Sequence, residues 1–422
     1  MKPSNLAGAL ALCLLVRALE AAEGEGPQIH GLLDMRAVRT DHTRSWLDGG
    51  LGKTRYGPPV GDDEATLLRL SQVSLLVDAP IGDVVSAHVQ INGDAEGDRE
   101  IDSSRVDLIQ AFVELRSEPS PKLRLRARLG LFFPPVSQEA DEIAWTGPYT
   151  ITPSAATSWI ADELRTIGVE GRAALKTEQS ELAATGALFG GNDPTGTLLA
   201  WRGWALGDRQ TGLSDRPPLA PIPAIEPGGL FEQAPRWVQP FREIDGRLGW
   251  YAAASYRRNG LVDVRLIRYD NRADPVVFDG FQYAWKTRFS SAAVRVELGS
   301  LELLGQYLGG DTTMGRTPAG RPKVDNAFWA AFAMASLHLG RHRLSVRYDD
   351  FYVDDDDEFQ VEDPNHEDGH AWTAAYVLRT GEAHRLALEW LNVDSDRDVR
   401  PSLRLPARAQ ETQLQASFRV RF

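Results

Sequence analysis

The chain has 422 residues, of which 25% are charged, and its formal net charge is −13. An acidic chain has no overall electrostatic attraction to nucleic acid, so nucleic-acid binding is not expected. Its one cysteine, Cys13, excludes a disulfide within the chain and argues against a thiolate metal site.

The first 22 residues have the layout of a secretory signal peptide, with a positive charge, an apolar run at 6–16 and then small residues. That run is shorter than the roughly 20 residues that a membrane-spanning helix needs. Acylation of Cys13, as in a lipoprotein, is a weaker alternative because bulky Leu12 precedes it. Cleavage within 18–22 would leave a single domain over 23–422, whose apolar stretches are too short for spanning helices. Any membrane insertion must therefore use strands.

Alternating apolar and polar residues recur throughout the mature chain, which is the pattern of half-buried strands. In the segment 83–92, for example, Val85, Ala87, Val89 and Ile91 share one face and polar residues share the other. We predict sixteen strands, with approximate cores at 28–40, 66–79, 83–92, 104–117, 122–132, 165–176, 181–189, 247–257, 261–271, 283–298, 300–308, 327–338, 341–353, 370–379, 383–393 and 410–422.

The connections between these strands alternate in length. Long polar connections separate short turn-forming sequences of the kind that close hairpins. Short turns at one end, long loops at the other and an even number of strands describe an all-β fold, the transmembrane antiparallel β-barrel of the bacterial outer membrane. The short turns lie near residues 80, 119, 178, 259, 299, 340 and 380.

A closed barrel meets the requirement that every backbone amide in hydrocarbon finds a partner within the protein. Trp250 and Tyr256, on the predicted outward face of one strand, lie about 20 Å apart at roughly 3.3 Å per residue. That spacing fits the two aromatic girdles that flank the apolar band of such barrels. We expect Phe422 to be another girdle residue and the last strand to close against the first, within 28–40.

Two alternatives compete with this interpretation. A secreted β-sandwich also has alternating strands, but it does not regularly alternate short and long connections over sixteen strands. The segment 326–339 could instead form a buried helix, although its place between a long loop and the tight turn at Gly340 favours a strand.

Basic residues follow one face of the predicted strand at 122–132, namely Lys122, Arg124, Arg126 and Arg128. Because a cation facing lipid costs roughly 2 to 4 kcal/mol near the bilayer midplane, we expect this face to line the lumen. A column of cations in a water-filled channel attracts anions. Glu114 is expected opposite Arg126 and would neutralise part of the column, which could also be ordinary lumen wall. Further basic candidates for the lumen wall are Lys286, Arg288, Arg343 and Arg347.

A long connection at 133–164 follows this strand, and long loops in compact domains are usually functional. It is the third external loop if the turn at 119–121 is periplasmic. Its acidic residues Glu139, Asp141 and Glu142 would set up a transverse field against a basic wall if the loop folds toward the lumen. The alternative is that the loop stays outside and these carboxylates are solvated.

The sequences "GLFFPPVSQEADE" at 130–142 and "ELRTIGVEGR" at 163–172 resemble the corresponding region of the phosphate-selective porins, the porin O/P family. This resemblance implies a sixteen-strand channel for small hydrophilic solutes or anions in the outer membrane, in contact with lipid and lipopolysaccharide. It also implies a homotrimer. The third loop departs from the family pattern, since its charged residues at 139–142 are acidic and it has no lysine.

A different function is a barrel that its long loops plug and that serves as a surface adhesin or binding platform. The connection at 190–246 contains eight prolines and three tryptophans, which favours an ordered lid or a subunit contact. The acidic connection near 354–369 lacks the glycine and final glutamate of a twelve-residue calcium loop, so a solvated tip is expected there. Divalent bridging to lipopolysaccharide is the alternative for this loop.

A hydrolase is the third alternative. Ser86 and His88 share one strand face and Asp107 lies on a neighbouring strand, but residues two apart on a strand are separated by about 7 Å. A nucleophile and its base need direct contact. We find no glycine-rich phosphate loop and no metal-ligand spacing, so we expect no enzyme, no cofactor and no metal.

Overall fold

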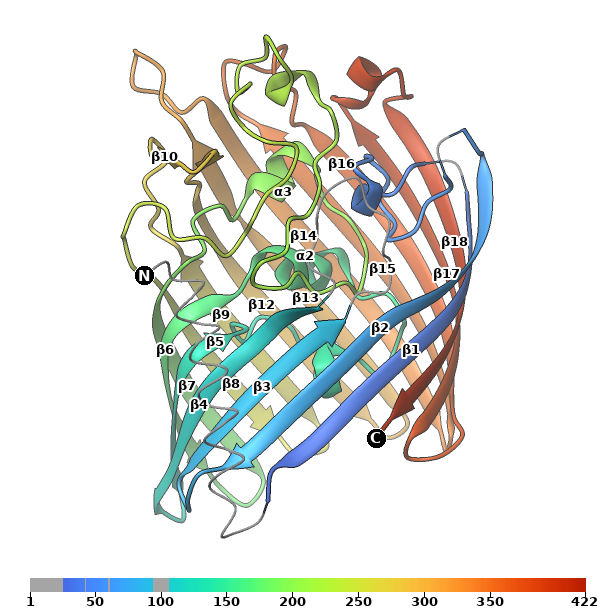
Figure 1. Cartoon of the computed structure of the whole chain (residues 1–422). Helices are drawn as coiled ribbons and strands as arrows, with labels where there is room; N and C mark the ends of the chain where they lie inside the picture. The colour runs from blue at the N-terminus through green and yellow to red at the C-terminus, as the bar shows by residue number, and fades with distance from the viewer. Residues whose placement is uncertain (1–25, 42, 60, 94–105) are drawn as a thin grey trace.

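The computed structural model describes residues 26–41, 43–59, 61–93 and 106–422, which form a closed antiparallel barrel (Figure 1). The predicted signal peptide lies outside the described residues. None of the helices among the described residues is long and apolar enough to cross a membrane.

All sixteen predicted strands are confirmed, including the strand at 326–339. Each strand pairs with its neighbours along the chain, and β1 also pairs with β18. A two-stranded hairpin, β10 (Phe278–Asp279) and β11 (Gln282–Tyr283), stands apart in the fifth external loop. The barrel strands are β1 (Gln28–Asp41), β2 (Glu64–Pro80), β3 (Val85–Gly93), β4 (Val106–Ser120), β5 (Leu123–Phe132), β6 (Thr166–Lys176), β7 (Ser180–Gly190), β8 (Gly249–Arg258), β9 (Val262–Asp270), β12 (Lys286–Leu298), β13 (Leu301–Met314), β14 (Val324–Leu339), β15 (His342–Asp355), β16 (Glu367–Arg379), β17 (His384–Arg397) and β18 (Arg408–Arg421).

The seam between β1 and β18 forms as the alternation predicts. The Gly31 N–H donates to the Phe422 carbonyl at 2.7 Å, and the Phe422 N–H donates back at 3.1 Å. The Phe422 ring covers Gly31 and lies where a Cβ on residue 31 would be, so a larger residue there would displace the ring. The barrel therefore has no open edge at this point.

The two faces of each strand meet different surroundings. In β7, Leu182 and Leu188 are exposed on the outer surface, whereas Ala187 and Phe189 are buried inside. Outward aromatic rings stack across strands, with Trp329 between Tyr307 and Tyr352 at centroid distances of 6.3 and 6.2 Å. This outer surface suits a bilayer, since apolar side chains form its band and amphipathic rings mark an edge.

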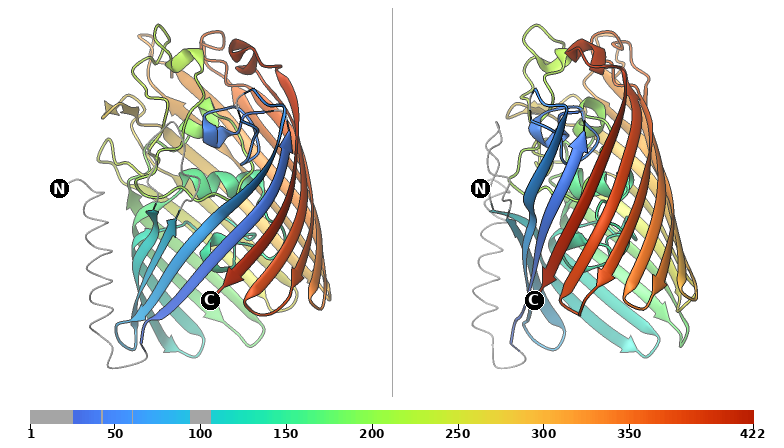
Figure 2. Two further views of the ribbon diagram at one scale, coloured as in Figure 1. Left: turned by 45° about the vertical axis from the view of Figure 1, so that its right-hand side comes forward. Right: turned by 90° about the vertical axis from the view of Figure 1, so that its right-hand side faces the viewer.

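The short turns gather at one end of the barrel and the long loops at the other, and both chain ends of the sheet lie at the short-turn end (Figure 2). By analogy with other outer-membrane barrels the short-turn end is periplasmic. The third loop (133–165) and the fourth loop (191–248) carry most of the remaining helical structure. The third loop contains η2 (Ile143–Trp145) and α2 (Ala155–Glu163), and the fourth contains α3 (Thr197–Trp201) and η3 (Pro223–Ile225). Two further short helices, η1 (Trp46–Asp48) and η4 (Arg400–Leu403), lie in the connections after β1 and β17.

Helix α2 of the third loop lies inside the barrel (Figure 1). Ser154 caps its first turn by accepting from the Thr157 N–H, and all nine helical residues are buried. Trp159 packs against Phe289 and Phe328 on the wall at centroid distances of 5.4 Å each. The expected inward folding of the third loop is therefore what the structure shows, and it creates an apolar core within the lumen.

Candidate functional site in the barrel lumen

The three predicted acidic residues of the third loop each contact an arginine of the barrel wall. Glu139 meets Arg347 at 3.2 Å and Asp141 meets Arg265 at 3.1 Å. Glu142 meets Arg379 of β16 at 2.8 Å. Ion pairs at three places on the wall therefore hold the loop across the lumen, and each carboxylate is neutralised locally.

Arg347 is the most deeply buried of these arginines. Its guanidinium donates to the Asp349 carboxylate at 2.7 Å and to the backbone carbonyls of Thr152 and Pro153 at 2.8 and 3.0 Å. Glu139, which it also contacts, accepts from the Ser154 N–H at 3.1 Å. Burial of such a cation is tolerable because charged and polar partners surround it, so Arg347 fixes the start of α2 to β15.

Arg124, Arg126 and Arg128 of β5 share one face, where acidic neighbours pair with them, whereas Lys122 of the predicted column lies in the turn before this strand. Arg128 donates two bonds of 2.8 Å to Glu170 of β6. Arg126 lies 3.5 Å from Glu170 and 3.6 Å from Glu114. The predicted register is wrong by two residues, because Glu114 stands opposite Arg128. Arg124 pairs with Glu118 at 3.0 Å near the periplasmic turn that contains Lys122.

Two of the further basic candidates are not on the lumen wall. In β12 the buried inward residues are Thr287, Phe289 and Ser291, so Lys286 and Arg288 lie on the outer face. Arg288 pairs there with Asp311 at 2.8 Å, partly exposed. Arg343 does face inward and pairs with Glu302 at 2.8 Å.

The C-terminal end of α2 joins the third loop to the fourth. The Glu163 carboxylate accepts from the backbone N–H groups of Gly196 and Leu198 at 3.1 and 2.8 Å, at the start of α3. Burial raises the pKa of this carboxyl to about 7 despite these donors. The neighbouring Arg165 donates to the carbonyls of Ile160 and Ala161, where a cation also complements the helix dipole.

The inward side chains of β1 to β4 and β18 are mostly polar, and this part of the wall is called the polar side of the lumen below. The wall along β8 to β17 is mixed. It carries the apolar cluster of Phe289, Phe328 and Phe351 together with buried charged groups such as Arg347 and Glu389. Each of the sixteen strands has at least one buried inward residue, for example Arg36, Gln72, Gln90, Glu114, Phe132, Glu170, Ala187, Tyr251, Tyr269, Phe289, Leu308, Phe328, Phe351, Ala371, Leu391 and Gln413. The loops therefore fill much of the bore.

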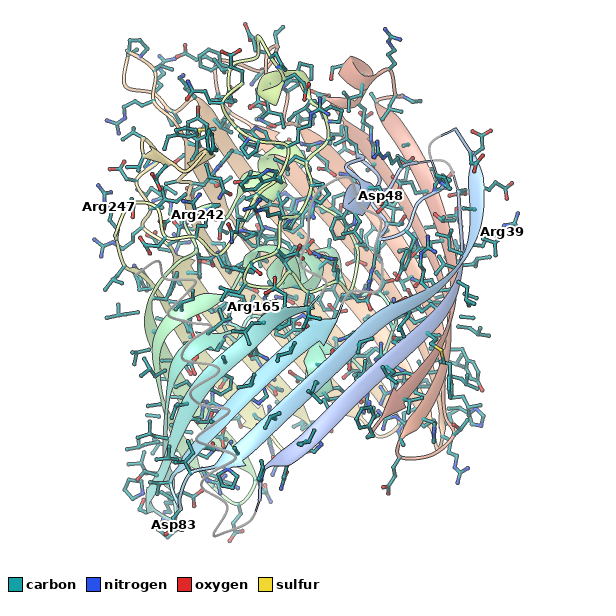
Figure 3. The ribbon with its side chains drawn as sticks, viewed as in Figure 1. Arg39, Asp48, Asp83, Arg165, Arg242 and Arg247 are labelled. Atoms are coloured by element: carbon teal, nitrogen blue, oxygen red, sulfur yellow. The ribbon has the colours of Figure 1, made fainter. Side chains whose placement is uncertain are left out.

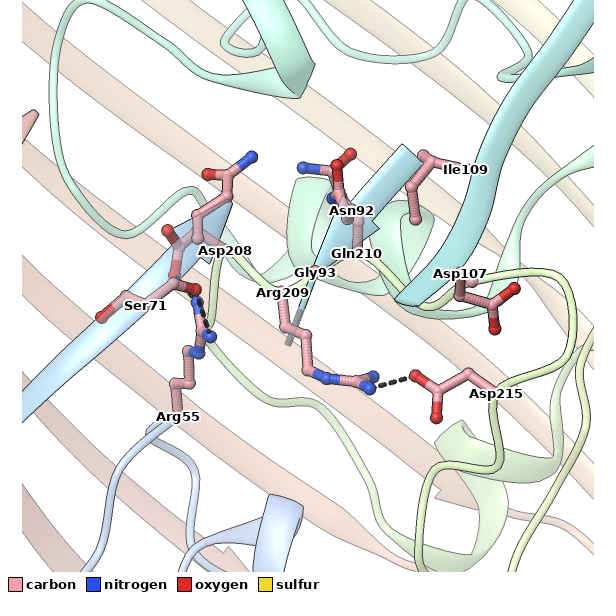
Figure 4. A pocket seen from close by; sticks show the side chains of 12 residues that line it. Arg55, Ser71, Asn92, Gly93, Asp107, Ile109, Asp208, Arg209, Gln210 and Asp215 are labelled. Atoms are coloured by element: carbon pink, nitrogen blue, oxygen red, sulfur yellow. Dashed lines mark hydrogen bonds and ion pairs between the residues drawn. The ribbon is translucent and has the colours of Figure 1, made fainter. Parts of the chain in front are cut away.

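A polar cavity of about 40 Å³ remains on the polar side, between the fourth loop and the walls of β2 to β4 (Figure 4). Arg55 of the first loop pairs with Asp208 of the fourth loop at 2.9 Å, and Arg209 pairs with Asp215. Burial would raise the pKa of Asp208, but Arg36 and Arg55 hold that pKa well below its usual range. The cavity is large enough for water, and charged groups surround it. Its other lining residues are Ser71, Gln72, Asn92, Gly93, Asp107, Ile109, Gln210 and Gly212.

Sequence reasoning did not single out the cavity residues of the first and fourth loops. Arg55, Asp208 and Arg209 lie in segments without periodicity, so no pattern marked them. The inward arginines Arg265 and Arg379 were detectable in principle, because each occupies the lumen-facing parity of a predicted strand.

His88 and Asp107, two residues of the hydrolase alternative, have separate partners. The His88 Nδ1 lies 2.7 Å from the Asp78 carboxylate, and the imidazole stacks on Phe112 at 4.9 Å. Asp107 instead accepts from the Ser214 N–H and hydroxyl at 3.0 and 2.9 Å. The geometry does not bring His88 and Asp107 into a catalytic contact.

Comparison with known proteins supports the architecture. No protein-family model matches the chain, and no curated protein matches its sequence. Among solved structures, OmpF of Salmonella typhi in complex with daunomycin aligns at 10% identity and a TM-score of 0.50, over 94% of this chain and 97% of that chain. A loop L8 deletion mutant of OmpT, an outer membrane protein of Vibrio cholerae, aligns at 9% identity and a TM-score of 0.50, over 94% and 99%.

Likeness at such low identity concerns the fold alone, and the fold agrees with the physical argument. A closed sixteen-strand barrel with an apolar outer band and aromatic edges requires a bilayer around it. The chain accordingly has the sixteen-strand β-barrel fold of outer-membrane porins.

Proposed function

We propose that the barrel is a narrow channel for small hydrophilic solutes, which pass along the polar side of the lumen. The observation that supports this proposal most directly is the cavity between the fourth loop and β2 to β4. Its walls carry charged and amide side chains from both the loop and the barrel. A solute that leaves bulk water can exchange hydrogen bonds with such walls.

The charges along this side nearly balance. Arg55 and Arg209 face Asp107, Asp208 and Asp215, and the arginines of β5 are paired with glutamates. A balanced lining gives no strong preference for either sign of ion. We therefore propose a weakly selective channel, in place of the anion preference that the basic column suggested. A homotrimer and contact with lipopolysaccharide stay predictions from the resemblance.

Single-channel recording in planar bilayers tests this proposal. We expect the wild-type protein to give a small, stable conductance, because the loops leave little open cross-section. Arg209→Ala removes the ion pair with Asp215 at the cavity and should raise the conductance by a factor of about 1.5 or more. The matched control is Arg236→Ala, which breaks an exposed ion pair with Glu226 in the same loop and should leave conductance unchanged.

A second function has a specific observation in its favour. The fourth loop contributes Trp201, Phe231 and Val238 to an apolar core that it shares with the first loop and the barrel wall, as an ordered extracellular structure would. A barrel plugged in this way could serve as a surface binding platform. Absence of conductance in both the wild type and Arg209→Ala, with the barrel folded, would contradict the channel and favour the platform.

A further inference from the structure

Three arginines from three strands surround one carboxylate of the third loop. The Glu142 carboxylate lies 2.8 Å from the Arg379 guanidinium of β16 and 3.7 Å from that of Arg385 of β17. Arg421 of β18 contacts its other oxygen. The register places Arg379 beside Arg385, at the periplasmic end of the barrel, with all three arginines on the inward face.

Positive charge exceeds negative charge around this cluster. A cavity of about 400 Å³ is lined by the same three arginines together with Arg341, and its lining contains one carboxylate, Glu382. Arg379 and Arg421 keep 47% and 27% of their side chains exposed, so small anions reach them from the periplasm. A site of this kind favours a planar carboxylate, because guanidinium groups bind both of its oxygens.

We propose that Arg379, Arg385 and Arg421 form a binding site for small carboxylates at the periplasmic mouth, and that Glu142 occupies this site in the resting molecule. The carboxylate of Glu142 shows that the three guanidinium groups can together bind a carboxylate. A free carboxylate competes with a tethered one, whose effective concentration is in the millimolar range for a short flexible tether. Displacement of Glu142 then frees the part of the third loop that lies nearest the periplasm.

The backbone next to Glu142 is strained, and this strain offsets part of the cost of releasing Glu142. Ala144 and Trp145 have φ values of 54° and 58°, and neither is a glycine. Left-handed conformations are unfavourable for a residue that carries a side chain. Two consecutive residues of this kind persist only when the surroundings hold them.

Hydrogen bonds connect this strained turn to the proposed solute path. The Ala144 carbonyl accepts from Gln210 of the fourth loop at 2.8 Å and from Gln72 of β2 at 3.2 Å. Both amides also line the polar cavity. A carboxylate at the periplasmic mouth would therefore loosen a turn that borders the cavity. This consequence rests on the proposed channel, whereas the binding site itself does not.

Calorimetric titration of detergent-solubilised protein with succinate, at constant ionic strength in sodium chloride, tests the site. Glu142→Gln removes the competing charge and keeps the shape, so we expect succinate to bind at least about tenfold more tightly than to the wild type. Glu178→Gln, at a separate periplasmic turn, is the matched control and should bind like the wild type. Adding Arg379→Gln to Glu142→Gln should abolish the gain.

Equal succinate affinity in folded wild type and Glu142→Gln would overturn the proposal, as would a gain that survives the loss of Arg379. Heat-modifiable migration on gels checks that each variant is a folded barrel. Since binding is measured without conductance, a plugged barrel that binds succinate refutes only the channel. A conducting barrel that does not bind succinate refutes only the site.

Discussion

At the scale of single residues, the interior depends on charges that are buried together. Arg36 donates to Asp34 at 2.8 Å with both side chains fully buried, and Lys53 meets Glu367 in the same way. Removing one partner of such a pair leaves an uncompensated charge, which typically costs 3 to 5 kcal/mol. Polar groups therefore fix the positions of the loops, while apolar contacts fill the space between them.

Glu163 gives this interior a pH dependence. Its pKa is raised by burial to about 7 from an ordinary 4.5, so the folded state favours the neutral acid. The resulting stability is present below pH 4.5 and is lost as the pH rises through 7, which amounts to about 3 kcal/mol. We expect urea-unfolding free energies to fall between pH 5 and pH 8 in the wild type and to fall less in Glu163→Gln. A Glu163→Gln profile as steep as that of Glu178→Gln would contradict this assignment.

At the scale of secondary-structure elements, the β1–β18 seam is the contact that turns a sheet into a barrel. Its ladder runs from Leu32 opposite Arg421 to Thr40 opposite Gln413. Beyond the ladder, the terminal aromatic ring packs where residue 31 has no side chain. A local feature of two residues thus completes a closure that involves the whole chain.

The seam can be tested at Gly31. A valine there would displace the Phe422 ring, which is exposed and can move, so the cost is at the low end of the overpacking range, about 1 kcal/mol. We expect Gly31→Val to lower the unfolding free energy in urea by that amount. Gly82→Val, in a periplasmic turn with no atom within 4 Å of the added Cβ, serves as the control. Equal stability of the two variants would show that the ring does not seal the barrel.

At the scale of the whole molecule, the barrel has an apolar outside, a partly polar inside and a bore that three loops narrow. The outer band alone decides that the protein needs a bilayer, since the inward faces never meet lipid. The inner half of the structure decides what passes. These two tasks use opposite faces of the same strands, so outward substitutions should affect stability and inward ones transport.

The cost of placing a charge on the outer surface should depend on the depth of the residue in the bilayer. Leu266 and Leu248 are both exposed on the outside, Leu266 within β9 and Leu248 just before β8 at the loop end. We expect Leu266→Arg to cost about 2 to 4 kcal/mol and Leu248→Arg about 0 to 1 kcal/mol in vesicle-reconstituted protein. Urea titration monitored by tryptophan fluorescence gives both values. Similar costs at the two depths would be inconsistent with the proposed membrane position.

Much of the fold was predictable because alternation is a local property. Each residue of a barrel strand faces either lipid or lumen, so sixteen strands and their turns can be read without knowledge of their partners. Lys286 and Arg288 were misplaced for an instructive reason. At the loop end of β12 the outer face reaches the polar headgroup region, while the inner face, with Phe289, packs on the apolar core. In this part of β12 the charged side chains therefore face outward and the apolar side chains face the lumen, which is the reverse of the pattern in the membrane-spanning part of a strand.

The sequence by itself determined that the chain is a closed barrel and which face of most strands looks inward. It also placed Glu139, Asp141 and Glu142 on a long loop, yet it did not tell which arginine each would meet. Only the tertiary structure decided that Glu142 lies among Arg379, Arg385 and Arg421. Glu142 is more than 200 residues from each of these arginines and meets them only when the loop folds into a closed barrel. Local periodicity determines the strands of the barrel wall, whereas contacts between residues far apart in the sequence determine how the loops pack inside the lumen.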